Sequence, residues 1–114
     1  MPIQSRPSKE TSVTGLSDDL VAVVKEYAAQ CSKPMREIYD QAISEMVERI
    51  RSGEDVVFIA TAPGLPWKAR HIRLSYDVFE QWRETSAAQR VHKSVFFLKA
   101  IRDYLAAKGV EVPD

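Results

Sequence analysis

A chain of 114 residues is long enough for one compact domain or two interlocked halves. Its 16 Lys and Arg residues are balanced by 16 Asp and Glu residues, so only local patches of charge can support a nucleic-acid partner. The single cysteine, Cys31, excludes an intrachain disulfide and has no Cys or His neighbour at zinc-site spacing. No apolar run reaches membrane-spanning length, and the polar N-terminus lacks the apolar core of a signal peptide. We therefore expect a cytoplasmic protein.

The first half of the chain predicts an arm, a short strand and two helices. Residues 1–10 are polar with two prolines and are expected to be flexible, and residues 11–16 are a short β-prone run. Ser17 is a good N-cap, and an acidic pair follows it at the positive end of a helix. Apolar residues then recur at helical spacing. Residues 32–34 interrupt this pattern before a second helix, which ends at residues 52–53.

The connection between the halves, residues 53–68, contains an unusually apolar run. Val56–Ile59 is too apolar for a free linker, so we expect it to pack on the domain, with an edge strand as one possible form. Pro63–Pro66 then predicts a turn.

The second half predicts the same order of elements. Residues 68–74 alternate in character, as a half-buried strand does. Ser75 is expected to cap the next helix, and a turn near residues 90–91 leads to the last helix. Gly109 is the expected C-cap, before a tail over residues 110–114.

The two halves repeat one pattern at a constant offset along the chain. Leu16–Val21 matches Leu74–Phe79 at the start of the first helices, and at the same offset Ala42-Ile43 matches Ala100-Ile101 near the end of the second helices. Two unrelated helical hairpins also align somewhere, but here the start signal, the turn and the Ala-Ile pair all keep the same spacing. The pattern therefore favours a duplication, in which one chain does what a symmetric dimer does with two.

Each half reads strand, helix, tight turn, helix, and this order resembles the ribbon-helix-helix family of DNA-binding proteins, which includes the Arc and methionine repressors. The resemblance covers residues 11–51 and 69–109. In the second copy it rests on Ile72–Asp77 before the first helix, and on Ser94, Phe96-Phe97 and Ala100-Ile101 in the second helix. The tandem arrangement is similar to accessory DNA-binding proteins of conjugative plasmid and T-DNA transfer systems.

The resemblance implies a mainly α fold with a two-stranded antiparallel ribbon, a pseudo-dimeric double ribbon-helix-helix in one chain. The expected division is a flexible arm, a first repeat, a linker packed on the domain, a second repeat and a tail, over residues 1–10, 11–52, 53–68, 69–109 and 110–114. The sequence departs from the family at Ser32 and Arg90, where a glycine usually lies between the helices. The first strand has no basic residue and contains a glycine.

A two-stranded ribbon fits the major groove of DNA, where its outward side chains reach base edges. If Ile72 and Leu74 face the core, alternation predicts that base-reading residues face outward at Ala69, His71 and Arg73, and at the matching positions Thr11 and Val13. Arg73 could bind guanine O6 and N7 through two donors. The alternative is a solvated strand face with no ligand.

The start of each second helix is the expected phosphate-binding site, because free amides and the helix dipole favour an anion there. Basic and hydroxyl side chains occur at both places: Ser32, Lys33 and Arg36 in the first copy, and His92, Lys93 and Ser94 in the second. The alternative for each residue is helix capping or an exposed side chain.

The aromatic residues are expected to form core rather than a base-stacking platform; they are Trp67, Phe79, Trp82, Phe96, Phe97 and Tyr104. No catalytic constellation, metal set or phosphate-cradling glycine loop is present in the sequence, so we expect no enzyme activity, no metal and no cofactor.

The leading hypothesis is sequence-specific binding of double-stranded DNA, as a transcriptional repressor or as a relaxosome-type accessory factor. The protein would be a monomer that acts as a pseudo-dimer, with self-association on DNA left open. The alternative is a protein-interaction module, such as an antitoxin or adaptor subunit, motivated by the apolar Val56–Ile59 segment. The expected partner is double-stranded DNA, with a relaxase, a toxin or another protein as a possible further partner.

Overall fold

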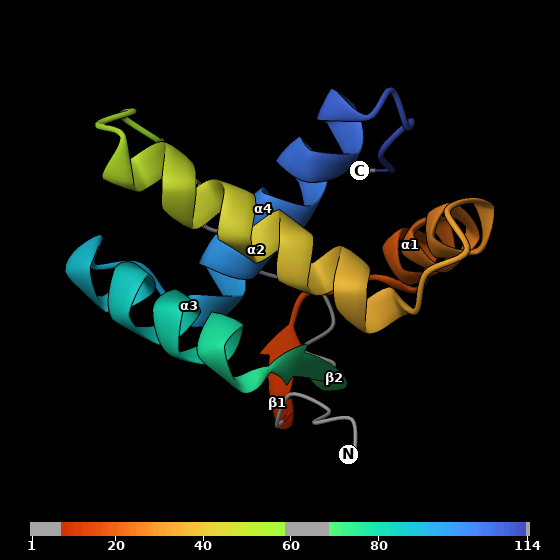
Figure 1. Ribbon diagram of the computed structural model, residues 1–114, viewed down its shortest axis with the longest axis horizontal. Coiled ribbons are helices and arrows are strands. Elements are labelled where there is room, and N and C mark those ends of the chain that lie inside the picture. Colours follow the sequence, from red (N-terminus) through yellow and green to blue (C-terminus); the bar gives the residue numbers. More distant parts are fainter. Residues whose placement is uncertain (1–7, 59–68, 114) are drawn as a thin grey trace, which may run out of the picture.

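The computed structural model describes residues 8–58 and 69–113 and contains two β-α-α units in sequence (Figure 1). The first unit comprises β1 (Ser8–Thr14), α1 (Asp18–Gln30) and α2 (Met35–Arg51). The second comprises β2 (Ala69–Ser75), α3 (Tyr76–Ala88) and α4 (Lys93–Ala107). The expected fold class, mainly helical with a two-stranded antiparallel ribbon, is confirmed.

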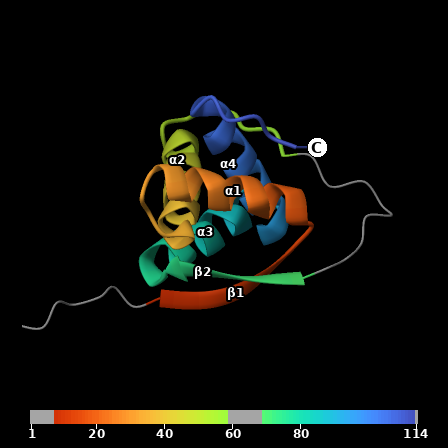
Figure 2. The ribbon, with the colours of Figure 1, turned by 90° about the vertical axis from the view of Figure 1, so that its right-hand side faces the viewer.

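The strands pair antiparallel along their whole length, from Ser8 opposite Ser75 to Thr14 opposite Ala69. Figure 2 shows the ribbon as one layer and the helices as a second layer on one side of it. The inner face of the ribbon buries three apolar side chains: Val13, Ile72 and Leu74. The other face of the ribbon has no helix over it in this view.

The helices repeat at the predicted offset, so that Asp18 at the start of α1 corresponds to Tyr76 at the start of α3. The buried positions of the two first helices follow the same offset: Leu20, Val24 and Ala28 in α1, and Val78, Trp82 and Ser86 in α3. Because the same face is buried in both, the duplication extends to the way that each first helix meets the core.

An aromatic cluster joins α2, α3 and α4. The ring of Phe97 lies 5.3 Å from that of Tyr39 and 5.6 Å from that of Trp82, measured between centroids. Trp82 also donates from Nε1 to the carbonyl oxygen of Lys93 at 3.0 Å. Of the residues expected in the core, Trp82, Phe96, Phe97 and Tyr104 are buried and Phe79 is partly buried.

Both turns between helices adopt the geometry that a glycine usually provides. Ser32 has φ 55° and Arg90 has φ 58°, in the left-handed region that disfavours residues with a Cβ. The amide of Lys33 donates to the carbonyl oxygen of Ala28 at 2.9 Å, as a Schellman motif requires. The turns are therefore preserved although the glycines are not.

Arg90→Gly is expected to raise the free energy of unfolding by about 0.5–1 kcal/mol, because relief of the left-handed strain exceeds the entropic cost of glycine. Urea unfolding followed by circular dichroism measures the change. Gln89→Gly is the matched control: its φ of −81° is right-handed, so the same replacement there should lower stability. A stability of Arg90→Gly below that of the wild type would contradict the prediction.

Hydrogen bonds interlock the two units. Asp40 of α2 accepts from the backbone N–H of Ser75 at 2.9 Å and from its hydroxyl at 2.6 Å. Conversely, Ser94 of α4 accepts from the amide of Thr14 at 3.1 Å. Ser75 occupies the N-cap of α3 as expected, but its hydroxyl donates to Asp40 of the other unit and makes no hydrogen bond to an amide of α3. Each second helix thus fixes the end of the strand that belongs to the other unit.

The apolar segment after α2 packs on the domain as expected. Val56 is buried, and the ring of Phe58 stacks on Phe96 with 5.4 Å between centroids. Its described part, residues 54–58, forms no strand. Ile59, the predicted turn at residues 63–66, and Trp67 lie outside the described residues.

Candidate nucleic-acid interface

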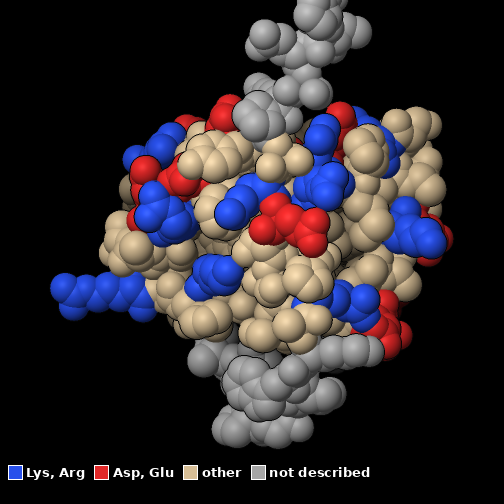
Figure 3. Space-filling model, turned by 90° about the horizontal axis from the view of Figure 1, so that it is seen from below, with Lys and Arg blue, Asp and Glu red and all other residues tan. Residues whose placement is uncertain are grey.

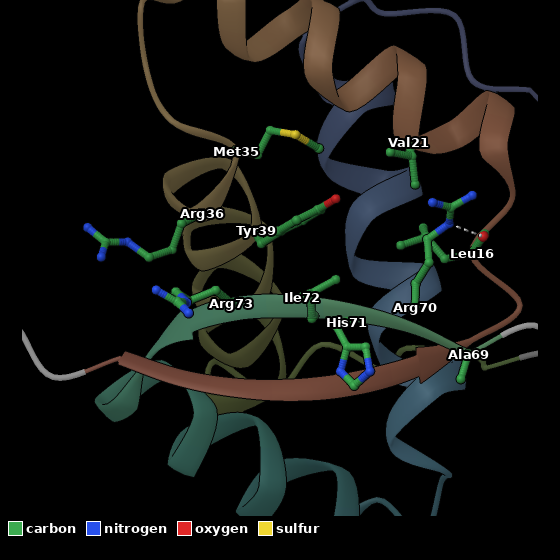
Figure 4. A pocket seen from close by; sticks show the side chains of 10 residues that line it. All are labelled: Leu16, Val21, Met35, Arg36, Tyr39, Ala69, Arg70, His71, Ile72 and Arg73. Atoms are coloured by element: carbon green, nitrogen blue, oxygen red, sulfur yellow. Dashed lines mark hydrogen bonds between the residues drawn. The ribbon is translucent and has the colours of Figure 1, made fainter.

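The outer face of the ribbon carries the candidate base-reading residues of the second copy. Ala69, His71 and Arg73 are exposed, as predicted, and alternate with buried Ile72 and Leu74. Figure 4 shows Ile72 directed toward the helices and His71 directed away from them. The second strand therefore presents a row of side chains that nothing in the described residues covers.

The orientation expected for Thr11 and Val13 is wrong. Val13 is fully buried, and Thr11 lies opposite inward-facing Ile72, so both belong to the inner face. The outward positions of β1 are Glu10 and Ser12, which lie opposite Arg73 and His71.

The cause of this error is the connection between β1 and α1. Residues 15–17 separate β1 from α1, whereas α3 follows β2 directly. Counted along the sequence, β1 and β2 are therefore further apart than α1 and α3 are. Gly15 has φ 84° and makes the extra turn possible. The number of intervening residues is odd, and side chains alternate between the two faces of a strand. Matching β1 to β2 at the offset of the helices therefore assigns each residue of β1 to the wrong face.

Glu10 is a functional candidate that the sequence pattern does not indicate, because residues 1–10 have the composition of an arm whereas β1 begins at Ser8. Its carboxylate lies 3.3 Å from a guanidinium nitrogen of Arg73 and 3.6 Å from Nδ1 of His71. The run Lys9–Val13 contains a weak signal for its orientation. Val13 and Glu10 are three residues apart, so in a strand they lie on opposite faces, with Val13 buried and Glu10 exposed. The outer face thus mixes acidic and basic groups.

The start of α4 lies beside β1 and is largely occupied by internal contacts. Nδ1 of His92 accepts from the amide of Ser94 at 3.1 Å, and Nζ of Lys93 donates to Oγ1 of Thr11 at 2.9 Å. Ser94 is buried and accepts from Thr14, so the expectation of a phosphate-binding hydroxyl there is wrong. His92 and Lys93 remain exposed.

The start of α2 lies beside β2 and is more open. Ser32 and Lys33 are exposed in the preceding turn, and Pro34 occupies the N-cap without a side-chain hydrogen bond. Arg36 in the first turn is half-buried. Its Nε is buried and has no hydrogen-bond partner among the described residues. The three candidates of the first copy therefore stay together at one accessible end of a helix.

A hollow of about 440 Å³ lies between this helix start, α1 and β2 (Figure 4). Arg36, Arg70 and Arg73 line it together with apolar side chains. Arg70 donates from Nε to the carbonyl oxygen of Leu16 at 3.2 Å and forms an ion pair with Asp18, so its charge is partly satisfied.

Tyr39, which also lines the hollow, stays neutral at physiological pH. Burial raises the pKa of its hydroxyl to about 12, because the low-dielectric surroundings disfavour the phenolate.

The charges on the ribbon side are interspersed rather than uniformly positive. Figure 3 shows this side, with Lys and Arg side chains spread across it and acidic atoms among them near the middle. A surface of this kind provides local attraction for phosphates without a strong general field. Such a surface would favour a ligand whose charged groups match the positions of these individual side chains.

Comparison with models of protein families, with curated proteins and with solved structures gave no match. No helix within residues 8–58 and 69–113 has the length and apolar character needed to cross a membrane. Nor do these residues contain a group of three or more His, Cys, Asp or Glu side chains placed to hold a metal ion.

Proposed function

We propose that this protein binds double-stranded DNA in a sequence-specific manner by inserting the β1–β2 ribbon into the major groove. The observation that carries the proposal is the exposed outer face of the ribbon, where His71 and Arg73 alternate with the buried residues of β2. The major groove admits a two-stranded ribbon and presents a distinct pattern of donors and acceptors for each base pair.

The positions of the second helices support the same proposal. The first turn of α2 lies beside β2, and that of α4 lies beside β1. Lys33 and Arg36 at one place, and His92 and Lys93 at the other, would contact phosphates on the two sides of the groove. Such contacts would orient the ribbon without reading sequence.

Binding of this kind would serve a transcriptional repressor or an accessory factor of DNA transfer, and both roles use the same interface. The alternative, a protein-interaction module, rested on the apolar segment after α2. Val56 and Phe58 of that segment pack on the core, which leaves Val57 as the one strongly exposed apolar residue of its described part. The ribbon face is therefore the better supported interface.

Arg73→Ala is expected to weaken binding to the preferred duplex by about 5- to 150-fold, because a bidentate contact to guanine contributes about 1–3 kcal/mol. Fluorescence anisotropy with a duplex selected from a random pool measures the loss. Arg51→Ala is the matched control, since Arg51 is exposed and is the last residue of α2. Figure 1 shows that α2 runs away from the ribbon toward this end. Equal affinities of the two variants would contradict the base-reading role of Arg73.

A further inference from the structure

Glu10 occupies an unusual place on the proposed reading face. It lies directly opposite Arg73 in the ribbon, and the same carboxylate also approaches His71. One acidic side chain from β1 thus holds both basic reading residues of β2. All three side chains are more than half exposed, so the cluster faces the solvent that DNA would replace.

Structural stability does not explain this cluster. Exposed ion pairs contribute little to folding, because water already solvates both charges. The ion pair does restrict Arg73, whose guanidinium must be directed at a base edge to read it. An acidic group on the face also opposes close approach of a duplex, whose phosphates are negative.

One base pair can satisfy both members of the cross-strand pair. Opposed side chains in an antiparallel ribbon begin about 4.5–5.5 Å apart at Cβ. In the major groove a G·C pair presents the O6 and N7 acceptors of guanine, which suit Arg73, beside the N4 donor of cytosine, which suits Glu10. An A·T pair also presents one amino donor, adenine N6, but at a different position. It lies beside N7, where Arg73 would need a second acceptor, and the O4 acceptor and methyl group of thymine lie where Glu10 would need a donor.

We propose that Glu10 is a specificity-determining residue that selects a G·C pair together with Arg73 and penalises duplexes without one. This inference rests on the proposed DNA-binding function. Glu10 accepts from cytosine N4 when the pair is present. When an A·T pair replaces it, the desolvated carboxylate faces the O4 acceptor and methyl group of thymine, with no donor at that position, and the complex is weakened.

The test compares wild type with Glu10→Gln, which keeps the shape of the side chain and removes its charge. Both proteins first select duplexes from a random pool. Their affinities are then measured for the selected duplex, for the same duplex with the chosen G·C pair changed to A·T, and for an unrelated duplex. Glu48→Gln, at an exposed position of α2, is the control with the same change of charge, and thermal unfolding reports whether either variant is misfolded.

Wild type is expected to prefer the G·C duplex over the A·T duplex by about 5- to 100-fold, as for one mismatched pair. Glu10→Gln should lose most of this ratio and bind the unrelated duplex several-fold more tightly, while Glu48→Gln behaves as wild type. An unchanged ratio in Glu10→Gln, with wild-type binding intact, overturns the role of Glu10 alone. Failure of the wild type to bind any duplex at low salt overturns the proposed function and this inference with it.

Discussion

Trp82→Ala is expected to lower the free energy of unfolding by about 3–5 kcal/mol, the range for removing a large aromatic side chain from a core. Trp82 is 1% exposed and contacts Phe97, and its Nε1 donates to the carbonyl oxygen of Lys93. The substitution would leave a cavity between α3 and α4 and would remove the side-chain hydrogen bond that joins α3 to the start of α4. Urea unfolding followed by circular dichroism measures the loss.

A milder variant separates packing from hydrogen bonding at this position. Trp82→Phe keeps an aromatic ring but removes the N–H, so it should cost about 1–3 kcal/mol, less than Trp82→Ala. A loss below about 1 kcal/mol in Trp82→Ala would show that the core does not depend on this side chain, contrary to its burial.

Asp40→Ala is expected to lower the free energy of unfolding by about 2–4 kcal/mol. Hydrogen bonds to a charged acceptor contribute about 1.5–3 kcal/mol each, and the substitution leaves the buried amide and hydroxyl of Ser75 without their partner. Because this contact joins α2 to the start of α3, its loss would also loosen the end of β2. Chemical unfolding measures the total effect, and hydrogen exchange at the β2–α3 junction measures the local one.

Two further variants test the Asp40 contact. Asp40→Asn retains an acceptor for the amide of Ser75 and should lose less stability than Asp40→Ala. Asp55→Ala removes an exposed carboxylate after α2 and should be nearly neutral. If Asp40→Ala were as stable as Asp55→Ala, the interlocking role of the contact would be wrong.

The helices could be predicted from the sequence because their apolar spacing is repeated at one constant offset. Leu20 and Val78 mark the same buried face in α1 and α3, and amphipathic spacing is a strong signal in elements of this length. The pairing of the strands followed from the resemblance rather than from composition. The structure confirms both the order of the elements and the antiparallel ribbon.

The residues of β1 that face the core could not be predicted in the same way. Its residues are mostly small and polar, so Val13 is the only strongly apolar side chain that distinguishes its two faces. The position of Glu10 opposite Arg73 depends on the longer turn through Gly15, which no helix periodicity reports. Contacts between distant elements, such as Asp40 with Ser75, depend on how α2 crosses the ribbon and leave no local pattern in the sequence.

The two strands of the ribbon occupy different places in one sequence, and this bears on how the proposed recognition of DNA would change by mutation. In a homodimer every substitution in the ribbon occurs twice, so each altered base contact must be accepted at both half-sites together. Here a change at Ser12 leaves His71 and Arg73 as they are, although all three share one face. Under the proposed function, target preference would therefore shift one contact at a time, while Ile72 and Leu74 keep the core face of the ribbon unchanged.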